Sequence, residues 1–168
     1  MRKILTITIL VLSFNAIGQT PTNCQDTTFV NVSYKKLCSP SFIDDFEGKR
    51  ISFKTLFLGE FTSTYYYVTS YGINVNDKVF INHKDTSDIS NTSEKPNSGL
   101  TLPQMPCFAL SIEKNKSDII FDLNKGDIVE ICGFAEKFKK EFVGTNGNVA
   151  LVNRTLEIHI IGIKKINK

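Results

Sequence analysis

The chain has 168 residues, of which 41% are hydrophobic and 22% are charged. These proportions are those of an ordinary globular protein and argue against disorder and collagen-like repeats. The formal charge of +3 includes Arg2 and Lys3 in the first few residues; without them 18 basic residues face 17 acidic ones. Such a balance gives no indication of a strongly electrostatic partner.

The first 18 residues have the three parts of a secretory signal peptide. Met1-Arg2-Lys3 is positively charged, residues 4–14 are mostly apolar, and Ala16-Ile17-Gly18 offers small side chains to a signal peptidase. The apolar run is too short to span a membrane as a helix, although a buried N-terminal helix or strand is an alternative interpretation. We therefore expect cleavage before Gln19 and an exported protein, periplasmic or extracellular, without stable membrane insertion.

Residues 19–45 are polar around one short apolar stretch, Phe29 to Val32, and are expected to form an N-terminal arm. Residues 46–168 are expected to form one domain, because no internal repeat or change of composition divides them.

The sequence of the domain predicts a series of strands. From Ile51 to Phe61 apolar and polar residues alternate, which predicts a long strand, and Gly59 is expected to bend it. Ser117 is expected to cap a short helix over residues 117–123, and Lys125-Gly126-Asp127 forms a turn. The other β-rich runs are residues 65–71, 78–82, 107–112, 128–134 and 156–166.

Two segments are predicted to be loops or turns. Residues 84–106 (Lys84 to Pro106) are almost entirely polar, and loops of this length are usually functional or disordered. Residues 137–148 (Lys137 to Asn148) are charged, contain glycine and are expected to form a hairpin or a loop. Both are candidate surfaces for recognising a partner, and the first is equally compatible with a surface insertion without a role.

The run from Leu123 to Phe134, with its Lys-Gly-Asp turn and terminal glycine, resembles the fourth strand of exported bacterial OB-fold proteins of uncharacterised function. Gly48-Lys49-Arg50 and the bent strand after it resemble the first strand of these barrels. The resemblance covers Phe46 to Ile166 and implies a mainly β fold: a small OB-type β-barrel with one short helix and the N-terminal arm. A two-sheet β-sandwich is the alternative. The resemblance transfers no functional residue, since the matching positions are structural.

The four cysteines all follow the leader and are even in number, which favours disulfides in an oxidising compartment. Of the three pairings we favour Cys24–Cys38, which closes a short loop, together with Cys107–Cys132; free buried thiols are the alternative. No CxxC spacing is present, and the two histidines are isolated, so no metal site and no cofactor are predicted.

Aromatic residues gather at positions 65–71. If this segment is a strand, Tyr65, Tyr67 and Tyr71 share one face and are weak candidates for stacking on bases or sugars. Ordinary packing of a barrel wall explains the same residues.

No catalytic motif is present, so we do not expect an enzyme. His159 and Glu157 alternate in one strand and are expected on its solvated face, although a histidine–carboxylate pair is able to do acid–base work. His83 with Asp85 is a weak candidate for a metal site. The acidic group of residues 44–47 is a weak candidate for the paired carboxylates of a hydrolase, and a solvated turn is its alternative interpretation. With only two arginines after the leader, nucleic-acid binding is disfavoured.

Together these observations favour an exported, non-enzymatic binding module that recognises another protein or an envelope component through barrel loops. One alternative is an oligonucleotide- or oligosaccharide-binding OB-fold that uses the tyrosines of residues 65–71. A second is an extracytoplasmic hydrolase, which requires His159 or the acidic group in a pocket.

Overall fold

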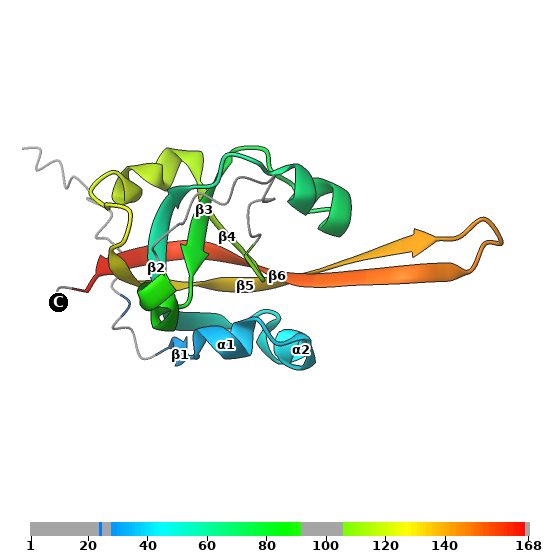
Figure 1. Ribbon diagram of the computed structural model, residues 1–168, viewed down its shortest axis with the longest axis horizontal. Helices are drawn as coiled ribbons and strands as arrows, with labels where there is room; N and C mark the ends of the chain where they lie inside the picture. Colours follow the sequence, from blue (N-terminus) through cyan, green and yellow to red (C-terminus); the bar gives the residue numbers. More distant parts are fainter. Residues whose placement is uncertain (1–23, 25–27, 92–105, 167–168) are drawn as a thin grey trace, which may run out of the picture.

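The computed structural model describes residue 24 and residues 28–91 and 106–166 (Figure 1). The expected leader and most of the polar segment that ends at Pro106 therefore lie outside the described residues. In chain order the elements are β1 (Val30–Asn31), α1 (Tyr34–Leu37), η1 (Pro40–Phe42), α2 (Ile43–Phe46), β2 (Arg50–Glu60), η2 (Tyr67–Tyr71), β3 (Lys78–Lys84), η3 (Thr86–Asn91), β4 (Ala109–Glu113), η4 (Lys114–Ile120), β5 (Ile128–Val143) and β6 (Val149–Lys165).

All six strands belong to one sheet in the order β1-β2-β3-β4-β6-β5, and β2 also pairs with β5. This second pairing closes strands β2 to β6 into a ring. The pairs β1–β2 and β4–β6 are parallel and the others are antiparallel. The expected small OB-type barrel is confirmed.

The bend in β2 lies where the sequence places it. Gly59 has φ of 103°, a conformation that glycine adopts without strain, and the register with β3 shifts between Phe57 and Glu60. The first part of β2 pairs with β5 and the second part with β3, so the bend carries one strand around the barrel.

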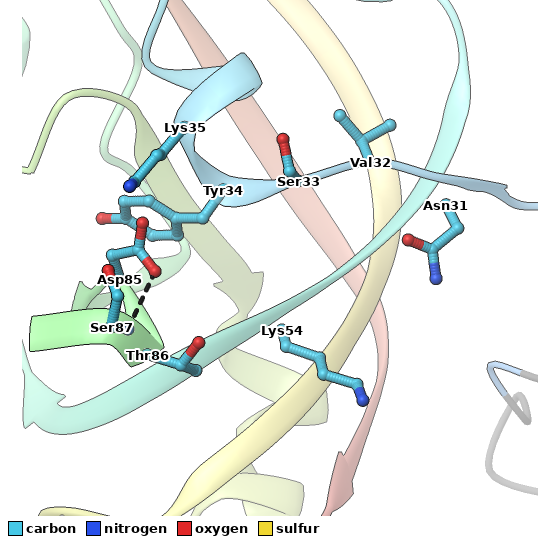
Figure 2. Close-up of a pocket in the computed structure, with 9 residues that line it drawn as sticks. All are labelled: Asn31, Val32, Ser33, Tyr34, Lys35, Lys54, Asp85, Thr86 and Ser87. Carbon is cyan, nitrogen blue, oxygen red and sulfur yellow. Dashed lines mark hydrogen bonds between the residues drawn. The ribbon is translucent and has the colours of Figure 1, made fainter. Parts of the chain in front are cut away.

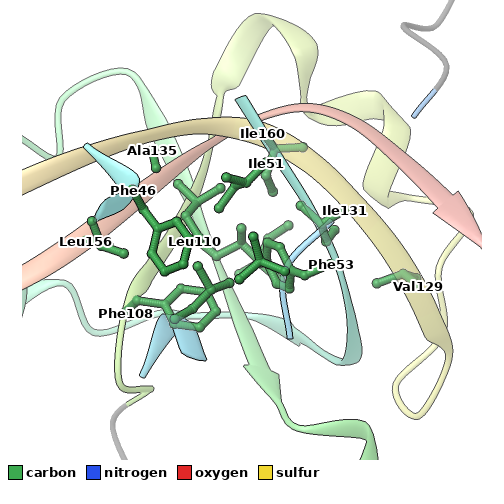
Figure 3. Close-up of a cluster of buried hydrophobic side chains, with 14 of the residues drawn as sticks. Phe46, Ile51, Phe53, Phe108, Leu110, Val129, Ile131, Ala135, Leu156 and Ile160 are labelled. Atoms are coloured by element: carbon green, nitrogen blue, oxygen red, sulfur yellow. The ribbon is translucent and has the colours of Figure 1, made fainter. Parts of the chain in front are cut away.

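The barrel interior is filled by apolar side chains that come from all five strands of the ring, β2 to β6 (Figure 3). Phe53 and Phe108 meet edge to face, with ring centroids 5.5 Å apart. The N-terminal arm contributes Leu37, Ile43 and Phe46 to this core, which explains why its helices lie directly against the barrel.

Strands β5 and β6 extend well beyond the ring. We expected a strand to end or bend at Gly133; it bends there but continues to Val143. A side chain at Gly133 would place its Cβ 2.5 Å from the carbonyl oxygen of His159, so only glycine permits this approach of β5 to β6. The expected hairpin or loop from Lys137 to Asn148 is therefore a hairpin, with a tight turn closed by Gly144 N–H donating to the Asn148 carbonyl.

The expected short helix between β4 and β5 is confirmed as η4, a 3₁₀-helix that begins three residues earlier than predicted. Ser117 lies inside this helix and donates to the Lys114 carbonyl, so it does not cap it.

The favoured disulfide pairing is wrong. The bonds are Cys24–Cys132, with Cα atoms 5.4 Å apart, and Cys38–Cys107, with Cα atoms 5.1 Å apart. The reason is that the fold separates the two cysteines of the arm: Cys24 lies against β5 and β6, with its Sγ 3.6 Å from the Gly162 carbonyl, whereas Cys38 follows α1 and lies beside Cys107, just before β4. Both bonds tie the N-terminal arm to the barrel and fit an oxidising, extracytoplasmic location.

We expect a non-reducing digest of the oxidised protein to yield peptides that join Cys24 to Cys132 and Cys38 to Cys107. Replacing Cys38 and Cys107 by serine should lower the free energy of unfolding by about 4 kcal/mol, because the bond closes a loop of 69 residues. Mass spectrometry and urea unfolding measure the two effects. A peptide that joins Cys24 to Cys38 would contradict the structure.

Candidate functional site

The tyrosine-rich segment is helical, so the expected strand over residues 65–71 is wrong. The Val68 N–H donates to the Thr64 carbonyl, and Gly72 ends the turn in the left-handed conformation with φ of 73°. Gly72 is the sequence signal for such an ending, and it outweighs the strand preference of the tyrosines.

This helical turn separates the three tyrosines instead of aligning them. Tyr67 is 1% exposed and stacks on Phe80, with centroids 5.3 Å apart, whereas Tyr65 is 76% exposed. Tyr71 is half-buried, and its ring meets the edge of Tyr66. Tyr67 is thus part of a small core on the outside of the barrel, and the exposed rings of this segment are those of Tyr65 and Tyr66.

A polar cluster lies beside this outer core. The strand registers place Ser111 of β4 opposite His159 of β6, and Glu157 of β6 opposite Glu136 of β5, all on the outer face of the barrel. Lys78 of β3 reaches the same place. Because β6 lies between β4 and β5, one short stretch of it gathers side chains from three other strands.

Glu157 is at the centre of the cluster and is completely buried. Its Oε1 atom accepts hydrogen bonds from Ser111 Oγ at 2.5 Å and from Lys78 Nζ at 2.7 Å. His159 Nε2 lies 2.8 Å from Glu136 Oε2, and His159 Nδ1 lies 3.5 Å from Glu157 Oε1. The expectation that Glu157 lies on a solvated face is wrong, because the segment between β2 and β3 covers it.

The cluster holds a serine, a histidine and carboxylates, but its geometry does not activate a nucleophile. Ser111 is 1% exposed and gives its proton to Glu157, while its Oγ is 3.4 Å from His159 Nδ1. A nucleophilic serine needs a base that takes its proton and access to a substrate. The arrangement instead positions a carboxylate.

The second histidine belongs to the core. His83 Nε2 donates to the Phe108 carbonyl at 3.2 Å, so the neutral ring accepts at Nδ1 from the Tyr34 hydroxyl at 3.0 Å. Burial lowers the pKa of His83 to about 4. Asp85 turns its carboxylate to the Ser87 N–H, so the pair that the sequence brings together is not brought together in space.

The acidic group of residues 44–47 braces the long hairpin. Asp44 accepts from Lys137 at 3.0 Å and pairs with Arg154, and Glu47 pairs with Lys137 at 2.7 Å. The Arg154 guanidinium, followed by the Lys137 ammonium, lowers the pKa of Asp44. These carboxylates are on the surface, and their partners are basic residues of β5 and β6.

We use the name ribbon for the part of the β5–β6 hairpin from Lys137 to Leu156. Figure 1 shows it projecting from the barrel between α2 on one side and η2 on the other. On the η2 side Lys140 Nζ donates to the Thr69 carbonyl and Asn153 Nδ2 to the Ser70 carbonyl. The base of the ribbon is therefore held on both faces.

The far half of the ribbon exposes aliphatic side chains. Val143 is 63% exposed and Leu151 is 55% exposed, and Val149 and Val152 are also exposed. Within the described residues no strand pairs with either outer edge of the ribbon. The sequence analysis described residues 137–148 as a charged hairpin or loop and did not single out these aliphatic residues, although their clustering around a glycine-containing turn is visible in the sequence.

A cleft of about 500 Å³ lies elsewhere, between the start of α1 and the end of β3 (Figure 2). Lys35 and Lys54 line it together with Asp85, and the Tyr34 ring forms one wall. The cleft is open and brings together side chains of both charges.

No helix in the described part of the chain is long and apolar enough to cross a membrane.

Comparison with known proteins gives weak similarity of structure alone. No family model and no curated protein matches the sequence. A protein assigned as an aspartyl-tRNA synthetase from Leishmania major Friedlin is 12% identical, with a TM-score of 0.42 over 86% of this chain and 23% of that chain. An aspartyl-tRNA synthetase from Entamoeba histolytica is 12% identical, with a TM-score of 0.41 over 85% and 22%. This chain spans less than a quarter of either protein.

His83 predicts a dependence of stability on pH. Because its pKa is about 4 when folded and 6.5 when unfolded, the unfolded chain binds the proton first, and stability falls as the pH drops from 6.5 towards 4. The loss attributable to this ring is ~3 kcal/mol. Urea unfolding at pH 7 and pH 4.5 should show a smaller loss for His83→Gln than for the wild type; equal losses would contradict this account.

Proposed function

We propose that this protein is an exported, non-enzymatic binding module that recognises another protein, or a component of the cell envelope, through the ribbon. The observation that supports this proposal is the group of exposed aliphatic side chains on the far half of the ribbon. Exposed apolar patches on soluble proteins mark interaction sites, because covering them removes apolar surface from water.

The construction of the ribbon base supports recognition by a positioned element. A two-stranded hairpin by itself is marginally stable in water. Here ion pairs to Asp44 of α2 and hydrogen bonds to η2 hold the base of the ribbon, where β5 and β6 continue from the barrel. The strands of the ribbon are therefore partly ordered before a partner binds, which reduces the conformational entropy that binding would lose.

The chemistry of the ribbon favours a protein partner. Within the described part of the chain no strand pairs with its outer edges, and their main-chain N–H and C=O groups suit pairing with an extended segment, the mode called strand addition. The valines at its far half supply apolar contacts beside those edges. Lys139 with Glu141, in an ion pair on β5, gives the same surface both charges.

Export is the second part of the proposal. The leader-like residues 1–18 and the two disulfides support it together, since disulfides persist in oxidising compartments. The absence of a nucleophile geometry around Ser111 supports a role in binding over a hydrolytic one.

The proposal is tested with two matched variants. Val143→Thr/Val149→Thr removes apolar surface from the ribbon, and Val30→Thr/Val68→Thr removes a similar amount from exposed valines elsewhere. We expect the ribbon variant to lose about tenfold in affinity for a protein that the wild type retains from envelope extracts, which corresponds to about 1.4 kcal/mol.

Both variants should melt at the wild-type temperature, and the control variant should bind as the wild type does. Equal retention by the ribbon variant and the control would refute recognition through the ribbon. Specific proteins retained by all three forms would place the binding surface elsewhere.

A second candidate function is the stacking of an oligonucleotide or oligosaccharide on Tyr65, and the exposure of this ring favours it. Replacing Tyr65 by alanine should weaken such binding by about 1–3 kcal/mol, whereas Tyr65→Phe keeps the ring and should bind normally. Fluorescence anisotropy with labelled single-stranded DNA and RNA, and with labelled glycans, measures the effect.

Tyr67→Ala is the matched structural control for this test. It should lower the free energy of unfolding by about 3 kcal/mol, because it empties a buried site under η2. Normal ligand affinity of Tyr65→Ala would exclude stacking at this ring.

A further inference from the structure

The outer face of the barrel contains two buried polar atoms without hydrogen-bond partners among the described residues: Glu157 Oε2 and Tyr67 Oη. A buried polar atom that lacks a partner is costly, and in folded proteins it commonly marks the place of a ligand, an ion or a water molecule. Glu157 is the stronger indication, because it is a carboxylate and its side chain is fully buried.

Glu157 also belongs to a group of metal-ligating side chains. Glu136, Glu157 and His159 each offer one donor atom, and these three atoms lie within 4.8 Å of one another. Lys78 and Ser111 both donate to Glu157 Oε1, so Oε2 is left with a lone pair that nothing occupies.

The other ring nitrogen of His159 faces the same carboxylate. Because the Glu136 carboxylate only accepts, a hydrogen of His159 is on Nε2, and in the neutral form of the ring Nδ1 carries a lone pair. Nδ1 lies 3.4 Å from Ser111 Oγ and 3.5 Å from Glu157 Oε1, and the Ser111 proton is already given to Glu157.

Charge also favours a cation at this place. Glu136 and Glu157 together carry two negative charges, and Lys78 neutralises one of them. A histidine nitrogen beside a carboxylate is a donor set for Zn²⁺ and related transition ions, whereas Ca²⁺ and Mg²⁺ take oxygen donors alone. The His159 side chain is 30% exposed, so an ion is able to enter from solvent.

We infer that His159 Nδ1 and the Glu157 carboxylate bind a divalent transition-metal ion on the outer face of the barrel. Glu136 holds the imidazole from behind through its Nε2–H, as carboxylates commonly do for metal-bound histidines. This site does not depend on the ribbon or on its partner. The absence of cysteine and histidine spacing motifs hid it in the sequence, because its members come from β5 and β6 and are aligned only by their register.

The test uses tag-free, oxidised protein that has been freed of metal with a chelator and titrated with Zn²⁺ by calorimetry. We expect one Zn²⁺ ion per chain, a higher melting temperature with Zn²⁺, and no binding of Ca²⁺ at the same concentrations. His159→Gln should abolish Zn²⁺ binding, and Glu136→Gln should weaken it by about tenfold to a hundredfold.

Glu141→Gln is the matched control, because Glu141 is an exposed carboxylate of β5, the strand that carries Glu136, and pairs with Lys139 away from the cluster. It should bind Zn²⁺ with the wild-type affinity. The chain has only two histidines, so proton NMR adds a second measurement: the His159 ring signals should move with Zn²⁺ and those of His83 should not.

Zn²⁺ binding that is unchanged in His159→Gln, Ca²⁺ binding of equal strength, or no Zn²⁺ binding by the wild type would each overturn the inference. Glu136→Gln has an exposed site of substitution and should remain folded, so its loss of affinity is not explained by unfolding.

Discussion

The pairing of β2 with β5 is the constraint on which the rest of this structure depends. It runs from Arg50 opposite Phe134 to Leu56 opposite Ile128 and closes the sheet. Closure gives each strand an inner and an outer face, so the alternation of apolar and polar residues becomes core and surface. Because β2 covers only the first part of β5, the remainder of β5 leaves the barrel paired with β6 alone and forms the ribbon.

The same closure explains why the outer face carries the polar cluster. Side chains on the outer face of β4 and β6 point away from the filled interior, so they contact either solvent or the segments that pack on the outside of the barrel. The segment between β2 and β3 covers part of that face with Tyr67 and buries Glu157 beside it. A carboxylate at this depth needs a counter-charge and hydrogen-bond donors; among the described residues Lys78 supplies the charge and Ser111 a further donor, both to the same oxygen.

Local sequence predicted the elements whose signals are local. The alternation after Arg50, the bend at Gly59 and the short helix before β5 follow from residue spacing and glycine placement. The disulfide pairing, the helical turn at Tyr67 and the burial of Glu157 did not follow, because each depends on a neighbour far along the chain. Cys24 is bonded to Cys132, 108 residues further along the chain, and the buried Glu157 accepts a hydrogen bond from Lys78, 79 residues before it. The exposed ribbon valines were missed because apolar residues in a predicted strand are normally buried, and the sequence does not show that this hairpin projects beyond the barrel.

The continuity of β5 and β6 from barrel to turn also has a mechanical meaning. A partner that pulls on the far half of the ribbon pulls along the strands and not across them. The load then falls in shear on the β2–β5 and β4–β6 ladders, whose hydrogen bonds stretch together instead of opening one after another. Two disulfides further tie the arm to the barrel on which this load falls. If the ribbon binds a partner as proposed, tension applied through it would be carried along these ladders, a geometry suited to a tether as much as to a receptor.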